Sequence, residues 1–219
     1  TPKVIAQAIL RWQNGPTSLP RGPHMKPDPL SMTPVTIADA QRDMRIAYYD
    51  GAPGIMTSGM VWLVAGTFAQ YASPERGVWV LLIGGMFIHP LAVLFNKALG
   101  RSGNHNPANP LAGLAMASTF WMIMCLLLAY AISTVRVDLF FPAVLLIIGG
   151  RYLTFATLYG TKIYWVCGAV LALAAFPLVK LNATPAIGAF TGGLIEVAFA
   201  LAVFASAERS QPAQRGAQA

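Results

Sequence analysis

The hydrophobic positions of this chain gather into long uninterrupted runs, and the polar positions are mostly confined to short breaks between them. A helix needs about 20 apolar residues to cross a bilayer, and six runs reach about that length. Strands of a membrane barrel would instead alternate apolar and polar residues over segments of about 10 residues. The pattern therefore predicts helices. The predicted spans are Pro53–Tyr71, Gly77–Leu99, Leu111–Val135, Leu139–Tyr159, Thr161–Val179 and Pro185–Ser206.

The breaks between successive spans are short. Residues 72–76 (ASPER), 136–138 (RVD) and 180–184 (KLNAT) leave room for little more than a turn, and short connections join antiparallel neighbours. The sequence therefore predicts an all-α membrane protein with six transmembrane helices arranged as three hairpins. This transmembrane domain covers residues 51–206, and the remaining residues 207–219 are expected to form a disordered C-terminal tail.

The composition agrees with a membrane protein and fixes its expected orientation. Hydrophobic residues make up 56% of the chain and charged residues 11%, against roughly 25% charged residues in soluble domains. Nothing in the chain resembles a nucleic-acid-binding module. An even number of spans puts both ends on one side, and Lys and Arg favour the cytoplasmic side. We therefore expect cytoplasmic termini in a bacterial inner (cytoplasmic) membrane. From Met32 onward the terminal side carries Arg42, Arg45, Lys97, Arg101, Lys162, Arg209 and Arg215, and the other side carries Arg76, Arg136 and Lys180.

Two segments precede the first span. Residues 1–35 form a proline-rich extramembrane tail that is either a natural extension or partly the remnant of an expression tag, and no signal peptide is evident in it. Residues 36–50 predict an N-terminal amphipathic juxtamembrane helix, because Thr36 and Asp39 form a capping-box pattern. This helix either lies on the lipid headgroups or serves as a cytoplasmic gate or docking element. Its apolar face is formed by Ile37, Ala40, Met44, Ala47 and Tyr48.

Glycine pairs recur in the even-numbered spans, each followed closely by a polar group. Glycine lets the backbones of membrane helices approach each other, so the pairs predict helix packing and, together, a weak internal repeat. Gly188, Gly192 and Glu196 recur at a spacing of four, which puts Glu196 on a face of small residues. The packing glycines are Gly84 and Gly85 before His89, Gly149 and Gly150 before Arg151 and Thr154, and Gly188, Gly192 and Gly193 around Glu196.

Arg151 and Glu196 are the main candidates for function. A charge at the centre of a spanning helix costs roughly 2.5–3.5 kcal/mol on insertion scales. At about 1.5 Å per residue, Arg151 lies roughly 18 Å from Leu139, and Glu196 lies roughly 17 Å from Pro185 on a parallel helix. The sequence therefore predicts an intramembrane polar pair. Three roles stay open: a structural ion pair that fixes helix register, a proton- or ion-coupled pathway, or a site at Arg151 for a lipid headgroup or anionic ligand.

The other polar residues within the spans are less informative. His89 precedes Pro90 and is either a hydrogen-bonded packing residue or a relay or ligand residue, with Thr154 as a second possible relay group. Cys125 and Cys167 lack metal-ligand spacing and are expected to be buried free thiols. No nucleotide-binding loop or set of catalytic residues can be assembled. We therefore expect no enzymatic activity, no metal site and no cofactor.

Three stretches carry a resemblance: residues 40–54 (AQRDMRIAYYDGAPG), 149–160 (GGRYLTFATLYG) and 163–168 (IYWVCG). They resemble an uncharacterised bacterial polytopic integral membrane protein family, a domain of unknown function, over roughly residues 39–205. The resemblance implies a multi-pass bacterial membrane protein and supplies no activity and no functional residues.

Two functions are favoured at this point, and an intramembrane enzyme ranks below both because no set of catalytic residues can be assembled. The first is an accessory or structural subunit of a membrane complex, with the lipid bilayer and other membrane subunits as partners. Short loops and many small residues on the helices favour it. The alternative is a small transporter or channel that uses intramembrane Arg151, Glu196 and His89, with an unidentified ion or small molecule as substrate.

Overall fold

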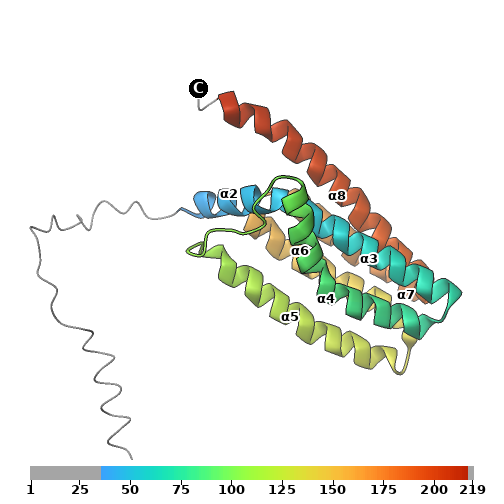
Figure 1. Cartoon of the computed structure of the whole chain (residues 1–219). Coiled ribbons are helices and arrows are strands. Elements are labelled where there is room, and N and C mark those ends of the chain that lie inside the picture. Colours follow the sequence, from blue (N-terminus) through green and yellow to red (C-terminus); the bar gives the residue numbers. More distant parts are fainter. Residues whose placement is uncertain (1–35, 217–219) are drawn as a thin grey trace, which may run out of the picture. The chain divides into compact units, whose positions relative to one another are not determined.

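The computed structural model describes residues 36–216, with side chains as far as Ala207, and this part of the chain is built from helices (Figure 1). Six helical segments are long and apolar enough to cross a membrane, which confirms the predicted all-α membrane fold. The proline-rich tail predicted for residues 1–35 lies outside the described residues. In chain order the elements are α2 (Ile37–Tyr48), the 3₁₀ turn η1 (Tyr49–Gly51), α3 (Ala52–Tyr71), α4 (Pro74–Ala98), α5 (Leu111–Ser133), the 3₁₀ turn η2 (Val137–Leu139), α6 (Phe140–Tyr159), α7 (Ile163–Lys180) and α8 (Pro185–Gly216).

The last helix is longer than the sequence pattern predicts. α8 continues beyond Ser206 to Gly216, so residues 207–216 differ from the disordered tail expected there. The segment that follows the apolar run is AERSQPAQRG. Ala, Glu, Arg and Gln are good helix formers, and they allow the helix to continue after its apolar residues end.

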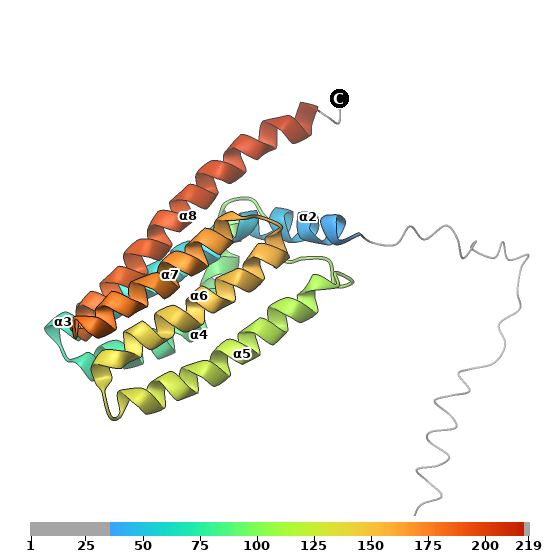
Figure 2. The same cartoon turned by 180° about the vertical axis from the view of Figure 1, so that it is seen from behind.

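The helices pack around a core made by α3, α6, α7 and α8. The most extensive interfaces join α3 to α8, α3 to α4 and α6 to α7, whereas the main neighbour of α5 is α6. α5 and α8 lie at opposite margins of the bundle in both views (Figures 1 and 2). Consecutive helices do contact each other. The α3–α8 and α6–α7 interfaces also join helices of different predicted hairpins.

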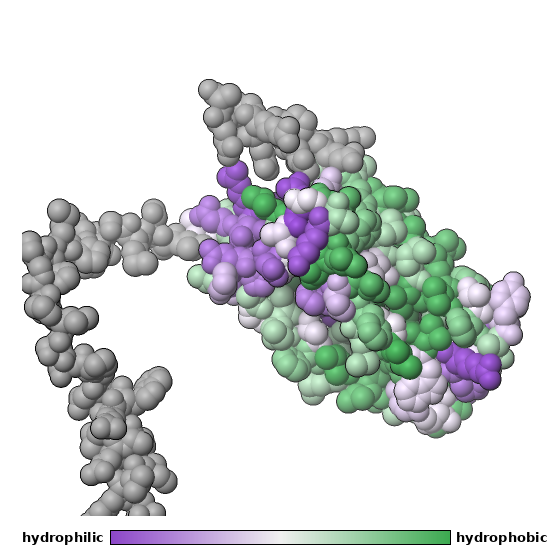
Figure 3. Space-filling view, viewed as in Figure 1, coloured by the Kyte–Doolittle hydropathy of each residue, from purple (hydrophilic) through white to green (hydrophobic). Residues whose placement is uncertain are grey.

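Hydrophobic and hydrophilic residues are segregated on the surface as a membrane requires. Figure 3 shows hydrophilic residues gathered around α2 at one end and at the opposite end of the bundle, with a hydrophobic band between them. Exposed large hydrophobic side chains are numerous on α4 and α5, for example Met86, Phe120 and Leu127. Such a surface fits a lipid bilayer.

α2 packs against the bundle. Its N-terminus has the predicted capping box between Thr36 and Asp39. Its predicted apolar face, for which contact with headgroups is one of two expectations, is partly covered by protein: Ala40, Met44 and Ala47 are buried, whereas Ile37 is exposed. Hydrogen bonds from α2 to the C-terminal end of α6, and from the α4–α5 connection to α2, hold the helix in this position.

Three anchors hold α2. Arg45 Nη1 donates to the carbonyl of Tyr159 (2.6 Å), and Gln41 Nε2 donates to the carbonyl of Thr157 (2.7 Å), so α2 caps the C-terminus of α6. Asn109, in the α4–α5 connection, donates to the carbonyl of Ala40 (2.9 Å) and to Asp43 Oδ2 (2.7 Å). α2 is thereby tied to both α6 and the α4–α5 connection.

A sharp corner joins α2 to α3. Tyr49, Asp50 and Gly51 all have positive φ angles, of 51°, 55° and 85°. Residues with side chains rarely adopt this conformation, and two of them in succession is a strained arrangement. The Tyr164 hydroxyl donates a short hydrogen bond to the carbonyl of Asp50, and a Cβ at Gly51 would collide with Tyr164 and Tyr159. Packing from α6 and α7 therefore holds the corner.

The predicted packing glycines fall into two groups. A Cβ added to Gly149 would lie 2.7 Å from the carbonyl oxygen of Gly168, where α6 crosses α7. Gly84, Gly188, Gly192 and Gly193 likewise face neighbouring helices. Gly85 and Gly150 face open space, with nothing within 4 Å of an added Cβ. Gly85 and Gly150 face a different direction from Gly84 and Gly149, because successive helical residues are about 100° apart around the axis.

This difference gives a matched pair of variants. We expect Gly149→Ala to lower thermal stability by about 1–3 kcal/mol, the usual cost of overpacking, because the new methyl group meets the backbone of α7. Gly150→Ala should leave stability unchanged or raise it slightly, since alanine favours helix and meets nothing there. Thermal unfolding of both variants in the same detergent checks this. Equal losses would contradict the close α6–α7 contact.

Candidate functional site

Glu196 lies in the centre of the packed core. Its side chain comes from α8 and is fully buried, at 0% exposed. Tyr152 of α6 donates its hydroxyl to Glu196 Oε1 at 2.8 Å. Among the described residues, the other carboxyl oxygen, Oε2, is buried without a hydrogen-bond partner. This group therefore has one firm polar contact, although a carboxylate can accept several hydrogen bonds.

All four core helices contribute to the surroundings of Glu196. Ser58 of α3 and Cys167 of α7 both lie close enough to interact with its carboxyl group. The backbones close in as well, because a Cβ at Gly193 would lie 3.0 Å from the carbonyl oxygen of Gly59. The carboxyl group is thus enclosed where α3, α6, α7 and α8 meet.

Arg151 points away from Glu196. Its Nη2 donates to Thr119 Oγ1 (3.1 Å), its Nη1 lies 2.8 Å from Met122 Sδ, and its guanidinium lies over the Phe155 ring. The first two contacts are on α5. Arg151 is half-buried there and joins the outermost helix to α6.

The direct ion pair predicted between Arg151 and Glu196 is therefore not formed. The two residues still interact electrostatically. Depth along the helices does not determine which face each residue occupies. Arg151 and Tyr152 are neighbours on α6 and are about 100° apart around the helix. It is Tyr152, and not Arg151, that faces α8.

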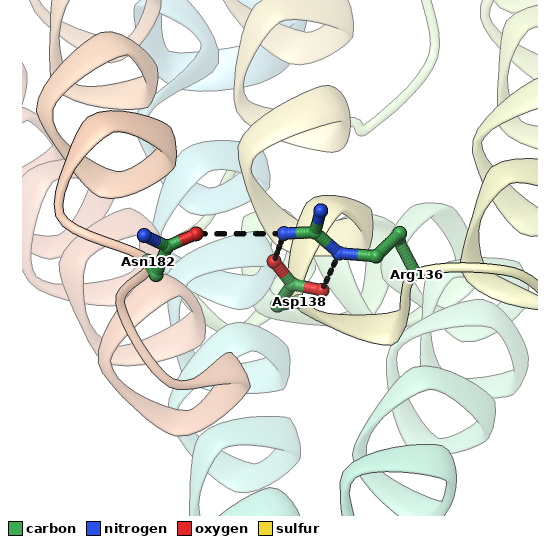
Figure 4. Close-up of polar contacts among 3 residues, drawn as sticks. All are labelled: Arg136, Asp138 and Asn182. Carbon is green, nitrogen blue, oxygen red and sulfur yellow. Dashed lines mark hydrogen bonds and ion pairs between the residues drawn. The ribbon is translucent and has the colours of Figure 1, made fainter.

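The ion pair found in the described part of the chain lies at the membrane edge, in the connections between helices. Arg136 binds Asp138 through two hydrogen bonds, the shorter at 2.6 Å, and also donates to Asn182 (Figure 4). The hydrogen bonds to Asp138 raise the pKa of Arg136. Exposed pairs of this kind contribute about 0–1 kcal/mol. This pair connects the α5–α6 and α7–α8 turns and is remote from Glu196 in the fold.

His89 lies outside the core. It is exposed on α4, and within the described residues it makes no hydrogen bond. Thr154 donates to the carbonyl of Arg151 within its own helix (2.7 Å). The structure therefore does not bring His89 and Thr154, the predicted relay residues, together with Glu196.

The structure adds an aromatic cluster that the sequence reasoning missed. Tyr152, Phe155 and Tyr159 of α6 lie along one helical face and pack against Tyr164 of α7. The rings of Tyr159 and Tyr164 are stacked, with their centroids 5.4 Å apart. The ring centroids of Tyr152 and Tyr164 are 5.9 Å apart. The spacing of three and four residues on α6 could have signalled this face. The cluster extends from Glu196 to the strained α2–α3 corner.

A polar layer surrounds that corner. Tyr48 Oη lies 2.8 Å from His105 Nδ1, and the Arg101 guanidinium lies over the Tyr49 ring. Arg45 and Arg101 both interact electrostatically with Asp50. Within the described residues no cluster of three or more His, Cys, Asp or Glu residues could hold a metal ion, and Cys125 and Cys167 are free thiols.

Comparison with known families decides the membership of the chain. A family model described as a family of unknown function, DUF7010, matches residues 37–206. The chain belongs to this family. No match was found among curated proteins or among solved structures. The resemblance to a domain of unknown function is thereby confirmed. Because the DUF7010 family has no assigned function, the function of this member is inferred from the geometry of its own residues.

The core contact can be tested with double-mutant cycles. Residues in direct contact usually show coupling energies of about 0.5–3 kcal/mol. We expect Tyr152→Phe and Glu196→Gln to be coupled in this range, measured by thermal or denaturant unfolding in detergent. The cycle of Arg151→Gln with Glu196→Gln should give a smaller coupling, because their side chains do not touch. A larger coupling for the Arg151 cycle would contradict the observed arrangement.

Proposed function

We propose that this protein is an accessory or structural subunit of a membrane complex and that the exposed face of α4 around His89 binds the partner. The observation that supports the proposal is the exposed imidazole of His89. His89 lies well inside the 25-residue helix α4, exposed and without a hydrogen bond to any described residue. An unsatisfied polar group in hydrocarbon costs several kcal/mol. A partner helix that hydrogen-bonds His89 would remove that cost.

The neighbouring residues of α4 suit helix association. Gly85 lies one turn from His89 and faces open space, so a partner backbone could approach closely there. Met86 lies on the same side and is 77% exposed. Small residues beside a polar group are the usual elements of helix interfaces in membranes. The outer face of α5 differs, since its exposed residues in the middle of the span are apolar and fit lipid.

The alternative of a small transporter or channel has weaker support. A pathway would need Arg151, Glu196 and His89 to face a common route. Arg151 faces α5, Glu196 is enclosed by the four core helices, and His89 is on the outer surface of α4. The geometry therefore favours the subunit role.

Crosslinking in native membranes tests the proposal. A photo-crosslinking residue at Met86, beside His89, should join the protein to one defined membrane protein in a fixed ratio. The same residue at Phe120, on the outer face of α5 and 61% exposed, is the matched control and should not. His89→Leu should reduce the Met86 crosslink at unchanged expression. Identical products from both positions, or a crosslink to a second copy of this chain, would contradict an accessory role.

We further propose that the termini are cytoplasmic in a bacterial inner membrane, in line with the excess of Lys and Arg on the terminal side. Ser102, between α4 and α5, would then face the cytoplasm, and Ser73, between α3 and α4, the other side. In a chain with both native cysteines replaced, a membrane-impermeant thiol reagent added to intact cells should label Ser73→Cys and not Ser102→Cys. The reverse pattern would invert the orientation, and labelling of both would contradict the six-span topology.

A further inference from the structure

The carboxyl group of Glu196 is poorly matched to a negative charge. It is fully buried, Tyr152 donates to its Oε1, and within the described residues its Oε2 has no hydrogen bond of standard geometry, with the Ser58 hydroxyl nearby. An ionised carboxylate in such a place would need further donors or a cation in contact with it. The neutral acid needs less, because one oxygen accepts from Tyr152 and the other carries the proton. The geometry therefore fits a carboxyl group that binds a proton.

The groups on the surrounding helices do not provide another cation. On α6, Tyr152 donates to Glu196, and the Arg151 guanidinium is bound to Thr119 and Met122 of α5. On α7 the facing titratable group is the thiol of Cys167, and on α3 it is the hydroxyl of Ser58 that faces Glu196. Calcium or magnesium would require six or more oxygen ligands. The proton is the cation that this site fits.

The geometry points to a proton-binding site at Glu196 and Tyr152 whose occupancy is transmitted to the α2–α3 corner through Tyr164. Binding adds a proton to Glu196 Oε2, and the nearby Ser58 hydroxyl, which can donate to the carboxylate, can rotate to accept a hydrogen bond from the new O–H. Loss of that proton leaves a carboxylate that attracts the Tyr152 hydroxyl more strongly, since hydrogen bonds to charged acceptors are shorter and stronger.

The path to the corner consists of direct contacts. The Tyr152 ring packs against Tyr164, with centroids 5.9 Å apart, and the Tyr164 hydroxyl donates to the carbonyl of Asp50. Asp50 lies within the corner of positive φ angles. A strained segment that packing holds in place is the kind of element that a small displacement can shift. A movement of Tyr152 therefore reaches the segment that joins α2 to α3.

Infrared spectroscopy of the full chain in lipid bilayers tests proton binding. Difference spectra between mildly acidic and mildly alkaline buffer should show the carbonyl band of a protonated carboxylic acid that disappears as the pH rises. The band should be absent in Glu196→Gln, shifted in Tyr152→Phe and unchanged in Glu75→Gln, an exposed carboxylate at the start of α4. A Glu196 that is ionised throughout, or protonated throughout, would overturn the proposal. So would a band abolished by sodium ions at constant pH and ionic strength.

Hydrogen exchange tests the link to the corner. After correction for the intrinsic rate, exchange of the backbone amides of residues 49–52 should change severalfold over the pH range in which the infrared band disappears. The change should be lost in Glu196→Gln. In Tyr164→Phe the infrared band should persist while the exchange no longer follows it. Exchange in the parent protein that does not vary with pH, or varies equally in Glu196→Gln, would overturn the coupling.

Discussion

One hydrogen bond, from the Tyr152 hydroxyl to Glu196, accounts for the way in which the core tolerates a carboxyl group. A buried polar group without a partner is costly in an apolar interior, and this bond supplies the one firm contact that Glu196 has. It also requires α6 and α8 to approach each other at a fixed register, with α3 and α7 closing the remaining sides. α4 and α5 pack outside these four helices, with Val78 and Leu81 of α4 and Ala129 of α5 buried against them. That division separates a closed interior, where a proton can bind, from an outer surface, where lipid or a partner subunit can pack.

The N-terminal helix α2 packs across one end of the bundle. α2 covers the end of α6 through Arg45 and Gln41, and Asn109 ties it to the α4–α5 connection. The chain then enters α3 through three residues with positive φ angles. These contacts explain how an amphipathic helix outside the membrane-spanning helices can be coupled to their interior. Tyr164 belongs to the aromatic cluster beside Glu196 and also holds the corner, so the centre of the bundle and the corner at its end share one residue.

The sequence predicted the features that depend on local patterns. Continuous apolar runs gave the six helices, the Thr36–Asp39 pattern gave the start of α2, and Gly149 was identified as a packing residue. The features that depend on helix rotation were missed. The prediction compared the depths of Arg151 and Glu196 along their helices, whereas rotation turns Arg151 toward α5 and Tyr152 toward Glu196. The partial burial of the apolar face of α2 was missed for a similar reason. Amphipathicity shows that one face will be covered, and it does not show whether lipid or protein covers it.

The central claim is that Glu196 contacts Tyr152 and not Arg151. Solid-state NMR of the protein in lipid bilayers measures both contacts directly, with the Glu196 carboxyl signal assigned by its loss in Glu196→Gln. We predict a close dipolar contact between that carboxyl carbon and the hydroxyl-bearing ring carbon of Tyr152, which disappears in Tyr152→Phe. The guanidinium nitrogens of Arg151 should cause no strong dephasing of the carboxyl signal. Strong dephasing by Arg151, with no contact to Tyr152, would show a direct ion pair in the membrane and contradict the account.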